Sequence, residues 1–127
     1  MNPELVLQHT RGQLPTSEFF FMLGDTKIGL LQLRHRPGRS KELPDRMANH
    51  IYYEIEPEYR GKGYGMQILT LGLKEAKKIG LSEVMLTCNE ENLPSKKIIT
   101  THGGEYIEDF VISSSGERIM KYRITLS

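Results

Sequence analysis

The sequence lacks a disulfide framework, a membrane-spanning segment and an excess of charge of either sign. Its single cysteine, Cys88, excludes internal disulfides, and no apolar run approaches the ~18 residues that a membrane-spanning helix needs. The 17 Lys and Arg residues balance 16 Asp and Glu residues, so no overall field would hold nucleic acid or an anionic membrane. The sequence therefore predicts neither nucleic acid nor a membrane as a partner.

No secretion signal is expected in the N-terminal residues. Residues 1–18 contain neither a basic region nor an apolar segment. Together with the single cysteine, this predicts a cytoplasmic protein. A chain of 127 residues can bury roughly two thirds of its unfolded surface, so one domain is expected to fold alone.

The first half of the chain reads as strands and loops. Residues 1–17 show little apolar periodicity and are expected to form an arm or a short strand, ahead of a folded domain over residues 18–127. Two apolar runs, 18–23 and 28–33, flank a Gly-Asp-Thr-Lys turn and predict a β-hairpin. Residues 35–49, rich in Arg, Lys, Pro and Gly, predict a long surface loop of the kind that often serves a ligand.

The second half alternates strands and helices. Residues 51–56 alternate apolar and polar side chains as in a strand, and Pro57 ends it. A helix of about four turns is expected up to Gly80, followed by a strand at 84–88 and a second helix that begins near Asn92. The chain ends in another predicted hairpin. The order β-β-β-α-β-α-β-β predicts one α/β domain in which helices flank a mixed sheet.

The stretch from Arg60 to Gly65 is the most informative part of the sequence. It joins a strand to a helix through three alternating glycines. Glycines let the backbone approach an anion closely, and the free N–H groups and dipole of a helix start favour negative charge. Arg60 and Lys62 add two cationic side chains. This pattern favours a pyrophosphate.

Other interpretations of these glycines remain open. The spacing is not the G-x-G-x-x-G of a dinucleotide site, and the chain is too short for a series of βαβ units. It is not a P-loop either, because the Gly-Lys-Ser/Thr ending is absent. The glycines could simply make a tight turn between a strand and a helix.

Two motifs resemble the GNAT family of N-acetyltransferases. The run from Arg60 to Gly65 matches its Arg/Gln-x-x-Gly-x-Gly/Ala signature, between the expected strand and helix. The strand at 84–89, followed by Asn92, Ser95 and a Gly-Gly stop, is similar to the family's next strand and helix. The resemblance covers residues 18–126 and implies a splayed mixed sheet whose V-shaped opening admits the pantetheine arm of acetyl-CoA.

The resemblance also implies roles for individual residues. Backbone N–H groups of six residues would bind the CoA pyrophosphate: Arg60, Gly61, Lys62, Gly63, Tyr64 and Gly65. The backbone of Ile55 and Glu56 would pair with the pantetheine like an added strand and polarise the thioester carbonyl. Asn92 could contact the pantetheine or only cap the helix, and Ser95 could reach the cofactor or stay structural.

The chemistry requires an amine to lose a proton before it attacks the thioester. A lysine-like amine has a reference pKa of ~10.4, so a base or a water chain must take that proton. Glu54 is the predicted catalytic base and Glu56 the alternative, although strand carboxylates are often only solvated. Many family members protonate the departing thiolate with a tyrosine where this chain has Ile99, so that acid is absent.

Several other residues are expected to be structural. Cys88 lies at the end of an apolar strand without a histidine partner motif and is predicted to be a small core residue. The four histidines have no metal-ligand spacing with one another or with Cys88, so no metal is expected. The basic loop at 34–41 could contact the CoA 3′-phosphate or an acidic substrate, or could merely be solvated.

The sequence supports one main function and one alternative. The main hypothesis is an N-acetyltransferase that moves an acetyl group from acetyl-CoA to a small-molecule or protein amine. In the family, an extra strand and two helices that help to build the acceptor site precede the hairpin, and here only residues 1–17 stand there. This shortening favours the alternative, a non-catalytic acyl-CoA-binding or regulatory domain. A third option is a homodimer that completes its acceptor site with the partner chain.

Overall fold

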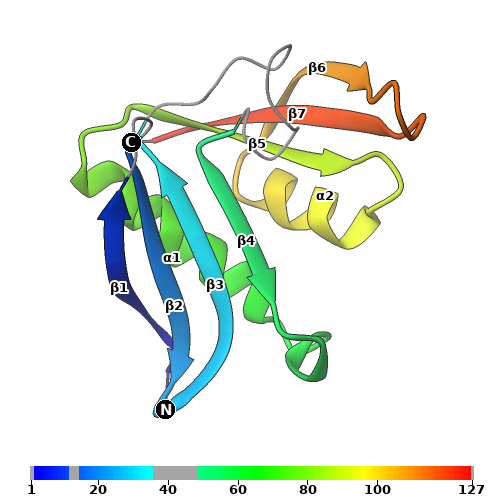
Figure 1. The fold of residues 1–127 in the computed structure, drawn as a ribbon. Helices are drawn as coiled ribbons and strands as arrows, with labels where there is room; N and C mark the ends of the chain where they lie inside the picture. The colour runs from blue at the N-terminus through cyan, green and yellow to red at the C-terminus, as the bar shows by residue number, and fades with distance from the viewer. Residues whose placement is uncertain (1, 12–14, 36–48, 127) are drawn as a thin grey trace.

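The computed structural model describes residues 2–11, 15–35 and 49–126 (Figure 1). The described residues contain two α-helices and seven strands: the six strands expected from the sequence, in the expected order, and one further strand at the N-terminus. In chain order the elements are β1 (Glu4–Arg11), β2 (Thr16–Leu23), β3 (Thr26–Arg34), β4 (Ile51–Ile55), the 3-10 turn Pro57–Tyr59, α1 (Tyr64–Lys78), β5 (Glu83–Asn89), α2 (Leu93–Thr101), β6 (Glu105–Val111) and β7 (Arg118–Thr125). The predicted α/β class is confirmed.

Residues 1–17 contain a full strand. β1 pairs antiparallel with β2, with Leu5 opposite Phe21. β2 begins at Thr16, so the expected boundary between residues 17 and 18 falls inside a strand. The N-terminal residues thus add an edge strand to the sheet, and no helix precedes β2 among the described residues.

The strands form two sheets that meet at one end. The first sheet has the order β1-β2-β3-β4 and the second β5-β7-β6, and every registered pair in both is antiparallel. At the junction the His50 N–H donates to the Met85 carbonyl, and the Met85 N–H donates to His50 Nδ1, both at 2.9 Å. Beyond this point β4 and β5 diverge (Figure 1). The expected splayed sheet is therefore confirmed, as two sheets joined at an apex.

Helix α1 covers one face of the first sheet (Figure 1). A Cβ on Gly72 of α1 would lie 2.5 Å from Leu31 Cδ1 and 3.6 Å from Ile51 Cδ1, so the helix packs directly on β3 and β4. Leu31, Ile51 and Phe21 are buried on this face. Because side chains alternate along a strand, the neighbouring residues of β2, β3 and β4 point to the opposite face.

The long loop predicted at residues 35–49 lies almost entirely outside the described residues. Its proposed contact with a 3′-phosphate therefore concerns residues that the structure does not describe, apart from Arg34 and His35. Arg34 is the last residue of β3 and is 4% exposed. Its guanidinium donates to Asn49 Oδ1 at 3.3 Å, so Arg34 is a buried part of the sheet rather than a solvated loop residue.

Candidate functional site

A cleft of about 780 Å³ lies between the two sheets, where β4 and β5 diverge. Its walls are β4 with the start of α1 on one side, and β5 with the start of α2 on the other. The lining residues are Asn49, Ile51, Tyr52, Tyr53, Glu54, Ile55, Tyr59, Arg60, Gly61, Gly63, Tyr64, Gly65 and Met66 from the first wall and Leu86, Thr87, Cys88, Asn92, Pro94, Ser95 and Ile98 from the second. The structure thus brings both sequence motifs to one cavity.

The start of α1 is built to receive an anion. Gly61 and Gly63 have φ of +77° and +84°, a conformation that L side chains rarely adopt, and a Cβ on either would meet nothing within 4 Å. Helix α1 begins at the next residue, Tyr64, with no side-chain cap and no acidic residue in its first turn. Its first N–H groups therefore have no partner within the helix. They lie at the positive end of the helix dipole, beside the cleft.

Gly65 has a different reason to be glycine. A Cβ at this position would lie 2.7 Å from Ile98 Cδ1 of α2. The residue therefore lets the two helices approach each other beneath the cleft. This packing role stands beside the phosphate role that the motif implies.

The two cations of the motif occupy different places. Arg60 lines the cleft, where its Nε donates to the Ile55 carbonyl at 2.9 Å and its guanidinium lies 4.0 Å from the Glu54 carboxylate. Lys62 does not line the cleft, and its ammonium lies 5.8 Å from the centre of the Tyr59 ring. Arg60 is thus tied to the end of β4, whereas Lys62 lies near the Tyr59 ring and outside the cleft lining.

Glu54 and Glu56 also differ. Glu54 lines the cleft with a half-exposed side chain, and its carboxylate accepts a hydrogen bond from the Tyr52 hydroxyl at 3.1 Å. Glu56 is not a lining residue. Its carboxylate lies 3.9 Å from the Lys27 ammonium, and its N–H donates to the Ile28 carbonyl at 2.8 Å. Of the two candidate bases, only Glu54 faces the cavity.

The bond between Glu56 and Ile28 also decides which backbone groups of β4 face the cleft. Strand residues send their N–H and C=O alternately to the two edges, and Glu56 sends its N–H to β3. The backbone N–H and C=O groups of Tyr53 and Ile55 therefore point to the cleft edge of β4. The N–H of Glu56 is not available to a ligand, and the carbonyl of Ile55 already accepts from Arg60 Nε, so Ile55 offers its N–H at the cleft edge.

The start of α2 is closed, in contrast to that of α1. Asn92 caps this helix, because its Oδ1 accepts a hydrogen bond from the Ser95 N–H at 3.2 Å. Both residues line the cleft. Ile99 stands where the resemblance would place a tyrosine that protonates the departing thiolate. It is 1% exposed and packs in the core. Asn92 thus caps the helix from within the cleft, and its contact with the pantetheine stays a prediction, as does that of Ser95.

Sequence reasoning missed Tyr53 as a cleft residue. Strand alternation places Tyr53 with Ile51 and Ile55, so the pattern indicated only a core position. Its hydroxyl is buried without a hydrogen-bond partner. Burial raises the pKa of Tyr53, and the nearby Ser95 hydroxyl opposes that shift. The phenol is therefore neutral at physiological pH.

Cys88 lines the cleft but is 8% exposed. Burial raises the pKa of its thiol, against a smaller lowering effect of Lys96. The sulfur thus stays protonated and is a poor nucleophile at neutral pH. No group of three His, Cys, Asp or Glu in the described chain could hold a metal ion, and no helix of the described residues is long and apolar enough to cross a membrane.

Comparison with known proteins identifies relatives of this arrangement. A family model described as an acetyltransferase (GNAT) domain matches residues 6–105. A search of curated protein sequences finds no match.

Solved structures share the fold at low sequence identity. A Bacillus subtilis acetyltransferase in complex with CoA superposes with a TM-score of 0.72 at 12% identity, covering 99% of this chain and all of that one. A Salmonella typhimurium protein with its cofactor acetyl-CoA gives 0.68 at 13% identity, covering 88% of this chain and 65% of the other. A spermidine N-acetyltransferase chimera of Vibrio cholerae and hSSAT gives 0.70 at 19%, covering 87% and 67%.

Proposed function

The chain belongs to the GNAT acetyltransferase family and is an acetyl-CoA-dependent acyltransferase, and from this premise we propose that it transfers the acetyl group to a primary amine by direct attack. The observation that carries the proposal is the uncapped start of α1 beside a cleft that separates two diverging strands. The open helix end suits the pyrophosphate of CoA, and the cleft between β4 and β5 suits its pantetheine arm. The cytoplasmic location stays a prediction.

The proposed binding mode uses mainly backbone groups. The N–H groups from Gly61 to Gly65 would hold the pyrophosphate, with Arg60 as the cation that lines the cleft. The cleft-facing backbone of Tyr53 and the N–H of Ile55 would pair with the pantetheine as an added strand, while the Ile55 carbonyl keeps its bond to Arg60 Nε. One N–H of this edge would donate to the thioester oxygen as negative charge develops on it.

The proposed reaction needs no covalent enzyme intermediate. The neutral amine nitrogen attacks the thioester carbon, the new C–N bond forms, and the C–S bond breaks to release the CoA thiolate. Glu54 would take the amine proton directly or through water, because it is the only candidate base of β4 that lines the cleft. The thiolate is a fair leaving group, since thiols have a reference pKa of ~8.5, and it would take its proton from water.

Thermal unfolding with added ligands tests the binding site. Acetyl-CoA or CoA at ~100 times its Kd should stabilise the protein by about 2.7 kcal/mol, whereas NAD and ATP should have little effect. Gly63→Glu should abolish the shift with CoA. Gly80→Glu is the matched control, because Gly80 has φ of +90° at the other end of the same helix and a Cβ there also meets nothing. Loss of the shift in both variants would point to backbone strain instead of the anion site.

Release of free CoA thiol with a panel of amines tests catalysis. An acetyltransferase should release thiol only when acetyl-CoA and an amine are both present. Binding of acetyl-CoA without turnover of any small amine or lysine peptide would support the non-catalytic acyl-CoA-binding domain. Sedimentation of the same sample would show whether a homodimer is needed.

A further inference from the structure

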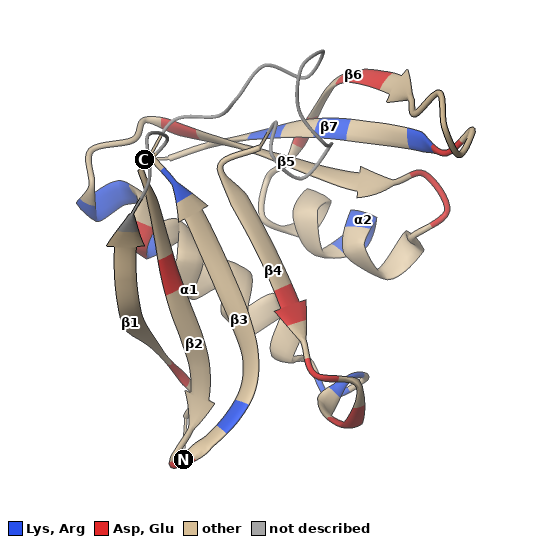
Figure 2. Cartoon of the chain, in the orientation of Figure 1, with Lys and Arg blue, Asp and Glu red and all other residues tan. Residues whose placement is uncertain are grey.

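The first sheet has one covered and one uncovered face. α1 packs on the face that carries Leu31 and Ile51, and in Figure 1 no helix of the described chain lies over the opposite face. Charged residues are sparse on β1, β2 and β3 (Figure 2). Within the described residues this face carries one apolar row beside polar side chains, since Glu18 lies opposite Gln32 and Gln32 opposite Tyr52.

An apolar row crosses this face and ends at the cleft. Val6 lies opposite Phe20, Phe20 opposite Leu30, and Leu30 opposite Glu54 in three consecutive strand pairs. Directly opposite residues share one face of an antiparallel sheet. Val6 is 40% exposed, and Phe20 and Leu30 are partly exposed. The three apolar side chains thus form a continuous strip, which we call the apolar row, with a carboxylate at its cleft end.

The cleft opens toward both faces of β4. Tyr53 and Ile55, which line it, point to the helix side, whereas Tyr52 and Glu54, which also line it, point to the uncovered side. The open start of α1 lies on the helix side. A donor whose phosphates bind at α1 leaves the uncovered side as the entrance for a second substrate.

From this geometry we propose that the apolar row binds the body of the acceptor, and that the enzyme prefers primary amines with an apolar, aromatic or aliphatic body. This inference rests on the proposed function and names the substrate class for the same site. The ammonium end would lie at Glu54, where charge complementarity holds it before it loses its proton. The hydrocarbon part would lie along Leu30, Phe20 and Val6, where it replaces water on apolar surface.

Charged neighbours of the row explain the direction of binding. The Lys27 ammonium lies 4.4 Å from the centre of the Phe20 ring, on the same face, and 3.9 Å from Glu56. A second cationic group on the acceptor would approach this lysine. Polyamines such as spermidine are therefore expected to be poorer acceptors than 2-phenylethylamine.

Steady-state kinetics with matched amines tests the proposal. kcat/KM should be highest for 2-phenylethylamine, lower for ethanolamine and lower still for spermidine. Leu30→Thr keeps a strand-forming side chain but makes it polar, and it should lower kcat/KM for 2-phenylethylamine by about 10-fold or more. The same variant should leave kcat/KM for ethanolamine and the KM for acetyl-CoA within about twofold, because a small polar amine does not use the row.

Three control variants separate the proposed role from a general loss of folding. Leu30→Met keeps the apolar surface and should retain activity toward 2-phenylethylamine. Val6→Thr is nearly isosteric, lies farther from the cleft and should have a smaller effect. Ile107→Thr makes the same kind of change on β6 of the other sheet, where Ile107 is 37% exposed, and should change nothing.

The possible outcomes are distinguishable. A thermal shift with acetyl-CoA combined with equal use of polar and apolar amines, or a neutral Leu30→Thr, would overturn the apolar-row proposal and leave the proposed function standing. Absence of any shift with acetyl-CoA would overturn the proposed function itself. If no amine is turned over, calorimetric titration of 2-phenylethylamine into the CoA complex gives the same test. Equal affinity of the unchanged protein and Leu30→Thr for this amine would overturn the apolar-row proposal. A dimer that Val6→Thr or Leu30→Thr dissociates would show that a second copy covers this face instead.

Discussion

The two walls of the cleft are built from the same strand-to-helix unit, but they end differently. On one wall β5 leads to α2, whose start is capped by the side chain of Asn92. On the other wall β4 leads to α1, whose start carries Gly63 and no side-chain cap. A helix needs partners for its first N–H groups, which the protein can supply itself or leave for a ligand. The uncapped wall is thus the one that identifies a binding site.

The largest effect should come from putting a negative charge at the open helix start. Gly63→Asp should weaken CoA binding by about 10-fold or more, because the carboxylate repels the pyrophosphate and competes for the same N–H groups. Gly63→Asn is the matched neutral variant, since Asn and Asp both tolerate positive φ. Calorimetric titration with CoA would measure both. Equal losses in the two variants would show that backbone geometry, and not charge, governs this site.

A substitution in the capped wall should change the stability of the protein and not its affinity for CoA. Asn92→Ala removes the acceptor for the Ser95 N–H and should cost about 1 kcal/mol in the free energy of unfolding. The Kd for CoA should change by less than about threefold. Urea unfolding and calorimetry on the same preparation would check both values. A large loss of CoA affinity would instead indicate that Asn92 contacts the pantetheine.

The apex that joins the walls should make stability depend on pH. Burial lowers the pKa of His50, against a raising effect of Glu83 and together with a further lowering effect of Lys121. Its Nδ1 accepts the Met85 N–H, so the neutral ring holds β5 to the start of β4. Because the folded pKa lies below the unfolded one, the unfolded state binds more protons just below pH ~6.5. The contribution of His50 to the free energy of unfolding is fully present above that pH and is lost as the pH falls toward the lowered pKa of the folded state.

Urea unfolding between pH 5 and pH 8 would measure this dependence. His50→Gln should flatten the part of the profile near pH ~6.5, since it removes the titrating group. An unchanged slope in this variant would assign the pH dependence to other groups.

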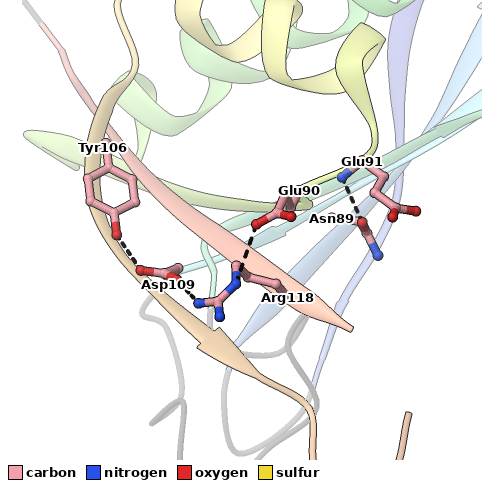
Figure 3. A network of polar contacts seen from close by, with 6 residues as sticks. All are labelled: Asn89, Glu90, Glu91, Tyr106, Asp109 and Arg118. Carbon is pink, nitrogen blue, oxygen red and sulfur yellow. Dashed lines mark hydrogen bonds and ion pairs between the residues drawn. The ribbon is translucent and has the colours of Figure 1, made fainter. Parts of the chain in front are cut away.

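The smallest effect should come from the polar network at the end of the second sheet where β5 and β6 end and β7 begins (Figure 3). Arg118 pairs there with Asp109 and with Glu90, the latter at 3.4 Å, and Tyr106 donates to Asp109. Exposed ion pairs contribute little to stability. Arg118→Ala should lower the Tm by no more than a few degrees and leave CoA binding unchanged. A clear loss of CoA affinity would show that this edge is coupled to the cleft.

Local patterns predicted most elements correctly. The glycine-rich start of α1 and the Asn cap of α2 were visible because each depends on residues within one turn of chain. Gly80, expected as the end of the first helix, has φ of +90° two residues after α1 ends. The sequence does not predict whether β1 is a strand or an irregular arm. Its exposed positions carry no sustained alternation, and pairing with β2 decides its conformation.

Gly65 shows what a local sequence pattern can and cannot predict. Its place in the motif indicated phosphate binding, whereas its contact with Ile98 depends on how two helices cross. Tyr53 is a second example. The alternation of β4 gives the face on which its side chain lies, but only the divergence of β4 and β5 places that side chain in a cleft.

The sequence alone determined the order of elements from β2 onward, the open helix start and the resemblance to acetyl-CoA-dependent enzymes, because these depend on short-range spacing and backbone conformation. The tertiary structure decided three further points: that Glu54 and not Glu56 faces the cavity, that His50 joins the two sheets, and that an apolar row leads to Glu54 across an uncovered face. Each of these depends on the pairing and splaying of strands that are far apart in the chain. Local spacing carries no information about that pairing.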